Sequence, residues 1–227
     1  NIASSCKAGI CHACKMKIVE GNVPQIAQKG LKDTQKEEGY FLSCQCKPEE
    51  DLCVCLPTEV DKKFSAQVIS LNKLSDGIIQ LIIKLNQPMS FHAGQFINLW
   101  KGNQLHRSYS IANLPNQENL IEMHIRHIPK GKLSSWVFYE LKKGDLVYIQ
   151  GPLGDCFYQL NKESKTKPIL LAGTGTGLAP LYGILIDALK QKHQGKIYFY
   201  HGALSDKQLY FVKNIRQLAQ NYDSVYY

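Results

Sequence analysis

The sequence has no apolar run of 18 residues, which is the length that a membrane-spanning helix requires. It also has no recognisable signal peptide, no arginine-rich run and no interleaving of basic with aromatic residues. We therefore expect neither a membrane segment in this chain nor a nucleic-acid partner. No internal repeat or low-complexity tract occurs, so ordinary globular domains are expected.

The composition indicates several domains, and the charge is unevenly divided between them. A chain of 227 residues with 44% hydrophobic and 20% charged residues predicts two or three domains. Residues 1–60 hold 7 Lys and 8 acidic residues and sum to −1, whereas residues 61–227 hold 20 Lys or Arg and 11 acidic residues and sum to +9. The basic part is expected to bind anionic cofactors or an acidic protein, or else to be an ordinary solvated surface.

Cysteine is concentrated near one end of the chain. Seven of the eight cysteines lie in the first 55 residues, at spacings typical of metal ligands rather than of a disulfide framework. This distribution predicts a protein of the reducing cytoplasm.

Three of these cysteines follow the pattern C-x4-C-x2-C, and a fourth comes 30 residues later. This is the ligand spacing of a plant-type 2Fe-2S cluster. Small residues between the ligands let backbone N–H groups approach the sulfides, and Gly9 permits a left-handed turn. The predicted ligands are Cys6, Cys11, Cys14 and Cys44. The alternatives are a zinc site, for which Cys46 would complete only a weak second pair, and disulfides or buried thiols.

Around this loop, residues 1–58 are expected to form a small α+β domain. Strands are predicted at 15–19 and 52–56, a short helix or loop at 31–39, and an apolar lead-in to Cys44 at 40–42. The remaining thiols, Cys46, Cys53 and Cys55, are interpreted as buried small hydrophobic residues. The strands that should precede the loop are not supplied, so we expect the N-terminus of the domain to be missing.

Residues 62–162 have the pattern of a small antiparallel β-barrel. The strand candidates are 66–71, 78–85, 95–100, 107–112, 120–128 and 145–150. One helix is predicted over 132–141, because Leu133, Trp136, Val137 and Leu141 recur at helical spacing. A tight turn is expected at 151–154, and Cys156 after it is interpreted as a packed thiol.

From residue 167 to 227, strands and helices alternate, which predicts a parallel, Rossmann-like sheet. The expected strands are 168–172, 196–200 and 225–227, and the expected helices are 178–191 and 205–221. The second helix is placed at Ser205 because Ser205-x-x-Gln208 resembles a capping box. The glycine-rich loop 173–177 is predicted to bind phosphate, although it differs from the fingerprint G-x-G-x-x-G.

Two short motifs in the predicted barrel suit a flavin. In Arg107-Ser108-Tyr109-Ser110, an arginine can hold a pyrophosphate, a tyrosine can pack on a flat ring and a serine can hydrogen-bond a ring nitrogen. Alone, this motif fits an ordinary amphipathic strand equally well. The segment 131–134 opens the predicted helix with glycine, and its free N–H groups would bind the same pyrophosphate.

In this order, the cluster loop, the R-x-Y-S strand, the G-x-x-S helix start, the G-P-x-G turn and the glycine loop resemble the ferredoxin–NADP reductase superfamily. The closest resemblance is to its three-module type, the reductase components of bacterial oxygenase systems. The likeness covers essentially the whole chain, with Ala-Gly-Gln at 93–95 in place of the usual Pro-Gly-Gln. It implies a multi-domain fold: an N-terminally truncated β-grasp ferredoxin domain, a six-stranded antiparallel flavin-binding barrel and a C-terminally truncated Rossmann-like nicotinamide domain.

The resemblance also implies roles for single residues. Arg107 would bind the FAD pyrophosphate, Tyr109 would pack on the ring and Ser110 would bond near N5, so Tyr109 and Ser110 are the catalytic candidates. The other implied cofactor-binding residues are His124, Ile125 and Arg126 along the ribityl chain, Gly131, Lys132, Leu133 and Ser134 at phosphate, and Gly173, Thr174, Gly175, Thr176 and Gly177 at NAD(P)H. Leu204 replaces an arginine of many relatives and Asp206 is close, which favours NADH over NADPH unless Asp206 serves only a helix dipole.

The function that this resemblance implies is electron transfer. Electrons would pass from NAD(P)H through FAD to the 2Fe-2S cluster and then to a protein such as an oxygenase component. Two alternatives remain open: the flavin and iron–sulfur subunit of an NADH–quinone reductase, and a zinc-stabilised interaction module that is not an enzyme.

Overall fold

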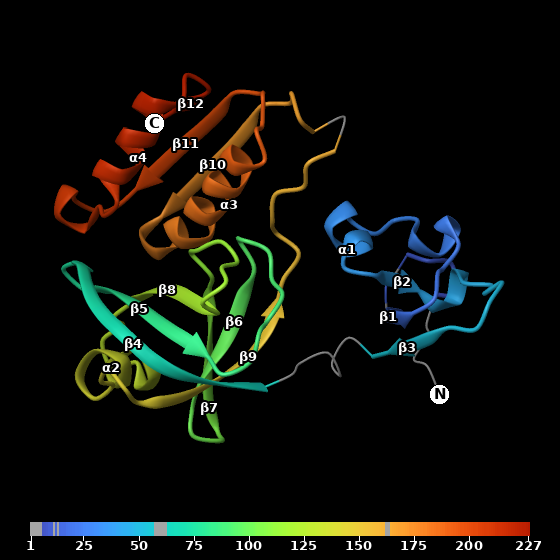
Figure 1. Cartoon of the computed structure of the whole chain (residues 1–227), viewed down its shortest axis with the longest axis horizontal. Coiled ribbons are helices and arrows are strands. Elements are labelled where there is room, and N and C mark those ends of the chain that lie inside the picture. Colours follow the sequence, from blue (N-terminus) through green and yellow to red (C-terminus); the bar gives the residue numbers. More distant parts are fainter. Residues whose placement is uncertain (1–5, 11, 13, 57–62, 162–163) are drawn as a thin grey trace. The chain divides into compact units, whose positions relative to one another are not determined.

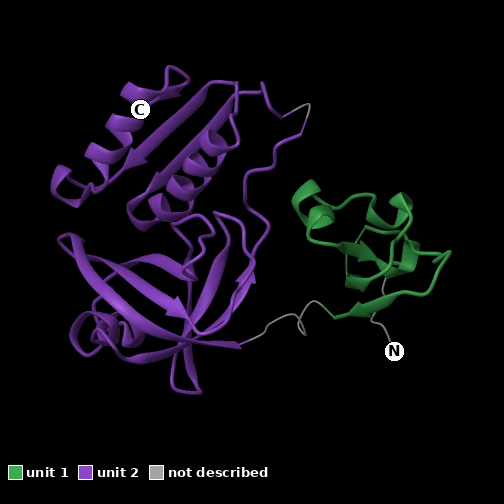
Figure 2. Cartoon of the chain, in the orientation of Figure 1, with its two compact units in different colours: residues 1–62 green, residues 63–227 purple. Residues whose placement is uncertain are grey.

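The computed structural model describes residues 6–10, 12, 14–56, 63–161 and 164–227. The chain divides into two compact units, Asn1–Lys62 and Lys63–Tyr227 (Figure 2). The three domain ranges expected from the sequence, 1–58, 62–162 and 167–227, stay predictions. No helix within the described ranges is long and apolar enough to cross a membrane.

Unit 1 is built on a three-stranded antiparallel sheet in the order β2-β1-β3. Its elements are β1 (Lys15–Glu20), η1 (Gln25–Gln28), α1 (Asp33–Glu37), β2 (Tyr40–Leu42), η2 (Ser43–Gln45) and β3 (Cys53–Cys55). Two small groups of buried side chains hold it together: Cys14, Leu31 and Leu42 in one, and Met16, Ala27 and Phe41 in the other.

The three cysteines interpreted as buried hydrophobic residues have different environments. Cys46 is half-buried and packs against the second of these groups, and its burial raises the pKa of its thiol. Cys55 is half-buried, but Cys53 is exposed. For Cys53 the interpretation is wrong, because Cys53 begins β3 opposite Glu20, the exposed last residue of β1, across a register shift.

The first part of unit 2 is a six-stranded antiparallel sheet in the order β7-β6-β9-β4-β5-β8. Its strands are β4 (Lys63–Ser75), β5 (Ile78–Leu85), β6 (Phe96–Lys101), β7 (Leu105–Ser110), β8 (Leu120–Arg126) and β9 (Leu146–Leu153). A bridge between Ile111 and Met123 joins the two ends of the sheet, so it closes into the predicted barrel. Ile121, Met123 and Ile125 alternate into its core, each with 0% of its surface exposed.

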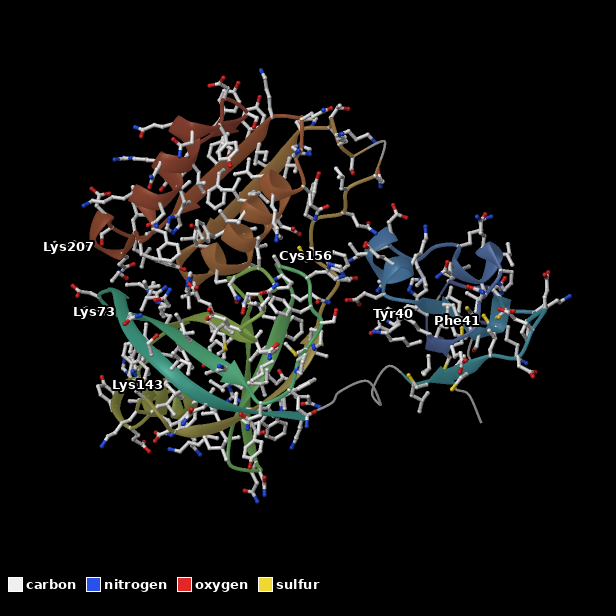
Figure 3. The ribbon with its side chains drawn as sticks, viewed as in Figure 1. Tyr40, Phe41, Lys73, Lys143, Cys156 and Lys207 are labelled. Carbon is white, nitrogen blue, oxygen red and sulfur yellow. The ribbon has the colours of Figure 1, made fainter. Side chains whose placement is uncertain are left out.

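Helix α2 (Lys132–Tyr139) interrupts the barrel strands as predicted, and buries Leu133 and Val137. The turn expected at 151–154 is wrong in its start. Strand β9 continues to Leu153, because Phe96 of β6 still pairs with Leu153 across a register shift. Cys156, in the segment between β9 and β10 (Figure 3), is exposed rather than packed. Its backbone oxygen lies close to the barrel at Gly94.

The second part of unit 2 is a parallel sheet in the order β10-β11-β12, as predicted. Its elements are β10 (Ile169–Thr174), η4 (Gly175–Gly177), α3 (Leu178–Lys190), β11 (Ile197–Gly202), η5 (Asp206–Gln208), α4 (Val212–Asn221) and β12 (Val225–Tyr226). Buried residues of α3 and α4 pack with Leu171, Ile197 and Phe199 of the sheet (Figure 1).

The helix predicted from Ser205 is wrong in its start. Residues 206–208 form the short 3-10 turn η5, Ser205 makes no side-chain cap, and α4 begins only at Val212. The break lies at Phe211, whose φ of +58° is left-handed. Tyr210 before it is 3% exposed and belongs to a core cluster, so burial of these two rings overrides local helix preference.

Candidate functional site

The loop that begins at Cys6 has backbone N–H groups aimed at sulfur. The N–H groups of Ala8 and Ile10 donate to Cys6 Sγ, each at 3.4 Å. Gly9 between them has a φ of +72°, and a Cβ at this position would lie 3.1 Å from Cγ of Gln45. The loop therefore needs glycine here both for its backbone conformation and for its close approach to the second cysteine segment.

Two of the predicted ligands are brought together by η2. The backbone N–H and the hydroxyl of Ser43 both donate to the carbonyl oxygen of Cys14, each at 3.0 Å. The Sγ atoms of Cys14 and Cys44 then lie 3.2 Å apart, close enough to ligate one metal ion. Cys46 lies in the other core cluster, so Cys44 is the better fourth ligand.

The pKa values of the two neighbouring thiols are shifted in opposite directions. Burial raises the pKa of Cys14. Hydrogen bonds from the Gln45 amide, at 3.5 Å, and from the Cys14 thiol lower the pKa of Cys44. Because the thiolate is the form that binds metal, Cys44 is prepared as a ligand.

These residues fit an iron–sulfur cluster in their chemistry. Cys6, Cys14 and Cys44 supply thiolates, and the N–H groups around Cys6 suit a negatively charged sulfur. Cys11, the fourth predicted ligand, lies outside the described residues. Within the described part of the chain, no group of three or more His, Cys, Asp or Glu side chains already surrounds one metal position.

A pocket of about 440 Å³ lies between β7, β8 and the start of α2 in unit 2. Its lining consists of Arg107, Ser108, Tyr109, Arg126, Ile128, Gly131, Lys132, Leu133, Ser134 and Thr176. Three cations and no acidic side chain are among these residues, so the pocket favours an anion. The structure thus brings the R-x-Y-S strand and the predicted phosphate-binding helix start to one place.

Tyr109 offers the pocket an aromatic surface that remains uncharged. Its ring packs against the barrel core, and burial raises the pKa of its hydroxyl to about 12, although the charge of Arg107 acts in the opposite direction. Arg107 itself is exposed, and its Nη1 donates to the His106 carbonyl oxygen at 2.8 Å, which leaves its other N–H groups for a ligand.

The start of α2 has the geometry of an anion site. A Cβ on Gly131 would lie 2.7 Å from Ser134 Oγ and 2.9 Å from the Ile128 carbonyl oxygen, so only glycine fits between them. Ser134 Oγ accepts from the Ile128 N–H at 3.1 Å and is 6% exposed. That hydroxyl therefore holds the loop in place, and the unpaired backbone N–H groups of the first helical turn are left for phosphate.

The predicted nucleotide loop reaches the same pocket through Thr176. Gly175 in this loop has a φ of +53°, and a Cβ on it would lie 3.5 Å from Arg126 Nη1. Gly173 is required by packing, because a Cβ there would lie 2.7 Å from Leu181 Cδ1. The flavin pocket and the nucleotide loop are therefore contiguous in this unit.

Eight residues predicted for cofactors do not line this pocket: Gly173, Thr174, Gly175 and Gly177 belong to the nucleotide loop, and the other four lie elsewhere. Ser110 follows Tyr109 at the end of β7 and is half-buried beside Phe96. Ile125 is in the barrel core, and His124 is buried against Tyr210. Asp206 is exposed at the start of η5.

Comparison with known proteins accounts for this arrangement. Three family models match the chain: "2Fe-2S iron-sulfur cluster binding domain" at residues 1–49, "Oxidoreductase FAD-binding domain" at residues 65–158, and "Oxidoreductase NAD-binding domain" at residues 171–227. The ferredoxin–NAD(P)+ reductase component of a naphthalene 1,2-dioxygenase system of Pseudomonas putida is 30% identical over 97% of this chain and 68% of its own length. The chain belongs to the ferredoxin–NADP reductase superfamily.

Other members of the superfamily support the same assignment. The phenol hydroxylase P5 protein of Acinetobacter pittii is 31% identical over 98% of this chain and 65% of its own length. The crystal structure of the Amycolatopsis cytochrome P450 reductase GcoB matches with a TM-score of 0.68 and 28% identity, over 100% of this chain and 71% of that one. This chain spans only about two thirds of the curated relatives, 65% and 68%. It carries the superfamily's domains for a 2Fe-2S cluster, FAD and NAD.

Sequence reasoning about this ferredoxin–NADP reductase homologue missed two pocket residues, Ser108 and Ile128. Alternation along a strand would place Ser108 on the opposite face from Arg107 and Tyr109. Ile128 follows the last residue of β8, Arg126, and is 53% exposed. An exposed isoleucine next to a glycine-led helix start was a usable signal for an apolar ligand surface.

Proposed function

We propose that this chain is an electron-transfer oxidoreductase that passes electrons from NAD(P)H through FAD to a 2Fe-2S cluster, and on to a protein such as an oxygenase component. One observation carries the proposal: Thr176 of the nucleotide loop lines the same pocket as Arg107 and Tyr109 of the flavin motif. A flavin bound here would supply the conversion between two-electron and one-electron transfer, which a nicotinamide and a one-electron cluster together require.

The side chains of this pocket bind and orient. Arg107, Arg126 and Lys132 neutralise phosphate from the barrel side, while the first turn of α2 offers backbone N–H groups. Burial raises the pKa of Tyr109 to about 12, so near neutral pH its phenol is uncharged and brings no negative charge to a bound ring. We assign Ser110 to tuning the reactive end of the flavin: Ser110→Ala should slow flavin reduction with flavin still bound, and an unchanged rate would remove Ser110 from this role.

The pyridine nucleotide that we propose is NADH. Leu204, which stands beyond the end of β11, is 89% exposed and offers no charge to a 2′-phosphate. Asp206 is exposed close by and suits a ribose hydroxyl. A cytoplasmic location goes with the proposal, because thiolate ligands must stay reduced.

The test is an anaerobic NADH titration of the full-length protein, followed from roughly 400 to 550 nm, where flavin and iron–sulfur centres absorb and zinc does not. We expect bleaching of both centres with stoichiometric NADH, and a much weaker response to NADPH. Colourless protein that contains stoichiometric zinc would contradict the proposal and favour an interaction module. Addition of an oxygenase component or of a quinone after reduction then identifies the class of acceptor.

A further inference from the structure

A chain of hydrogen bonds, buried at its His124–Tyr210 end, runs from the barrel to the nucleotide-binding part of unit 2. Gln80 Nε2, on β5, donates to Oε1 of Glu122 on β8 at 2.7 Å. The same oxygen lies 2.8 Å from His124 Nε2. His124 Nδ1 lies 3.0 Å from the hydroxyl of Tyr210, which precedes α4. The side chain of His124 has 0% of its surface exposed, and Tyr210 is 3% exposed.

The protons in this chain have defined positions. Burial would raise the pKa of Glu122, but the hydrogen bonds from His124 and Gln80 outweigh it and lower that pKa. A carboxylate only accepts, so His124 Nε2 must be the donor. Burial, with the nearby charge of Glu122, raises the pKa of Tyr210, so its hydroxyl keeps its proton and donates to Nδ1. With Nε2 donating to Glu122 and Nδ1 accepting from Tyr210, both ring nitrogens of His124 are hydrogen-bonded.

The backbone before α4 adopts an uncommon conformation at this contact. The rings of Tyr210 and Phe211 both pack edge-on against His124, with centroids 5.2 and 4.9 Å away. Phe211 has a φ of +58°, which non-glycine residues seldom adopt and which persists only where the surroundings impose it. Tyr182 of α3 packs against Phe211 at 5.0 Å. The nucleotide-binding part therefore presents two aromatic rings to a single histidine of the barrel.

The same barrel strand carries the contact with the nucleotide loop. Arg126 lies two residues beyond His124 on β8 and so shares its face. Arg126 lines the flavin pocket and approaches Gly175 of the loop. Strand β8 thus touches the nucleotide-binding part at two points. Two contacts along one rigid strand set both the distance and the orientation of the nucleotide-binding part relative to the flavin pocket.

Another directional contact across this boundary, between the hydroxyl of Tyr158 and Nδ1 of His193 at 3.0 Å, lies beyond the end of α3 that is opposite the nucleotide loop. A Cβ on Gly183 of α3 would lie 3.3 Å from Cβ of Ala93 and 3.2 Å from the carbonyl oxygen of Ala112, so helix and barrel approach closely through small residues. Apolar contacts of this kind bury surface but tolerate sliding, whereas a hydrogen bond weakens steeply with angle.

We propose that the bond between His124 and Tyr210 is a positioning device, which holds the nucleotide loop so that the nicotinamide meets the flavin at the distance that hydride transfer needs. This inference rests on the proposed function. Tyr210 is on this view a positioning residue: it acts through the placement of β11 and α4 and touches neither cofactor.

The test variant is Tyr210→Phe, which keeps the ring and its packing and removes only the donor. Misplacement of reacting groups by about 1 Å slows a reaction by up to about 100-fold, so we expect flavin reduction at saturating NADH to slow by about 10- to 100-fold. The apparent Kd for NADH and the FAD content should remain within about twofold, because no binding group is lost. Tyr222→Phe is the matched control. Tyr222 caps the C-terminal end of α4, is 43% exposed and is not a member of the hydrogen-bond chain, so this variant should match wild type.

Rates come from anaerobic stopped-flow reduction by NADH, and ¹⁵N NMR of the histidine rings gives a second reading without turnover. We expect a signal for His124 with the proton on Nε2 and a hydrogen-bonded Nδ1, and loss of that bond in Tyr210→Phe. Equal limiting rates for the two variants would overturn the proposal, as would a raised Kd with an unchanged limiting rate. If Tyr210→Phe does not fold, the ¹⁵N NMR spectrum of the wild-type protein tests the proposal. A neutral His124 ring with its proton on Nδ1 would overturn the proposal. Wild-type protein that NADH cannot reduce contradicts the proposed function instead, while the NMR result still stands.

Discussion

Replacing Gly94 by alanine measures how tightly the barrel is packed against the segment after β9 and against α3. Gly94 has a φ of +102°, and a Cβ there would overlap the backbone oxygen of Cys156 and lie 2.8 Å from Cδ1 of Ile184. The isoleucine end can rotate away, but the backbone oxygen can move only with its whole segment. We therefore expect a loss of stability that is larger than that from backbone strain alone.

Gly144 provides the matched control for backbone strain. Its φ is +94°, and a Cβ there would meet nothing within 4 Å. Gly144→Ala should thus lower the free energy of unfolding only by the strain of positive φ, about 1–2 kcal/mol. Overpacking adds about 1–3 kcal/mol, so Gly94→Ala should lower it by about 2–5 kcal/mol. Since 1 kcal/mol corresponds to about 2–4 °C in a domain of this size, Gly94→Ala should melt at least about 2 °C below Gly144→Ala.

The assay is urea unfolding followed by tryptophan fluorescence. The chain has 2 Trp, Trp100 and Trp136, and both lie in unit 2, so the signal does not mix in the unfolding of unit 1. Wild type and both variants are compared at one pH and one flavin concentration, because bound flavin adds to stability. Equal losses in Gly94→Ala and Gly144→Ala would refute the reasoning, since the segment around Cys156 would then yield to the added methyl group.

Three further predictions concern the cofactor sites. Cys44→Ser should abolish the iron–sulfur absorption of the purified protein and Cys46→Ser should keep it, because only the first thiol lies beside Cys14. Arg107→Ala should weaken FAD binding by about 10- to 100-fold in a fluorescence titration, the loss of one charge-assisted hydrogen bond of about 1.5–3 kcal/mol, and leave the cluster spectrum unchanged. The pKa of Tyr109 is raised from 10.0 to about 12, so the folded protein keeps a proton that the unfolded chain loses. Urea titrations should therefore show stability that is constant below pH 10 and falls towards pH 12, and Tyr109→Phe should reduce that fall.

Much of the barrel could be predicted because alternation records burial directly. Along β8 the apolar residues at 121, 123 and 125 point into the core and the polar ones between them point out, and all three are fully buried. The cluster loop could be predicted for a different reason. Ligand spacing along one loop is set by local geometry, so Cys6 and Cys14 need no knowledge of the rest of the fold, whereas the choice of Cys44 over Cys46 rested only on its apolar lead-in.

The features that escaped prediction depend on contacts between segments far apart in the chain. The exposed thiol of Cys156 follows from the path of the segment after β9, whose backbone oxygen at Cys156 lies close to the barrel at Gly94. Strand β9 extends beyond its predicted end because β6 pairs with it as far as Leu153. The turn preference of glycine and proline is a local property and carries no information about pairing with β6.

The surroundings of His124 and the late start of α4 depend on one contact between distant segments. Alternation places His124 on the outer face of β8 together with Arg126, whereas the resemblance implied that His124, Ile125 and Arg126 all line the ribityl chain. The capping pattern placed 205–221 in one helix, although a continuous helix would give Tyr210 and Phe211 helical backbone angles in place of the left-handed turn that brings both rings onto His124. Two adjacent aromatic residues within a predicted helix can therefore mark a contact between segments far apart in the chain. Amide hydrogen exchange or circular dichroism would show whether α4 extends towards Ser205 in Tyr210→Phe. If it does, burial of the Tyr210 hydroxyl is what overrides the local helical preference of this segment.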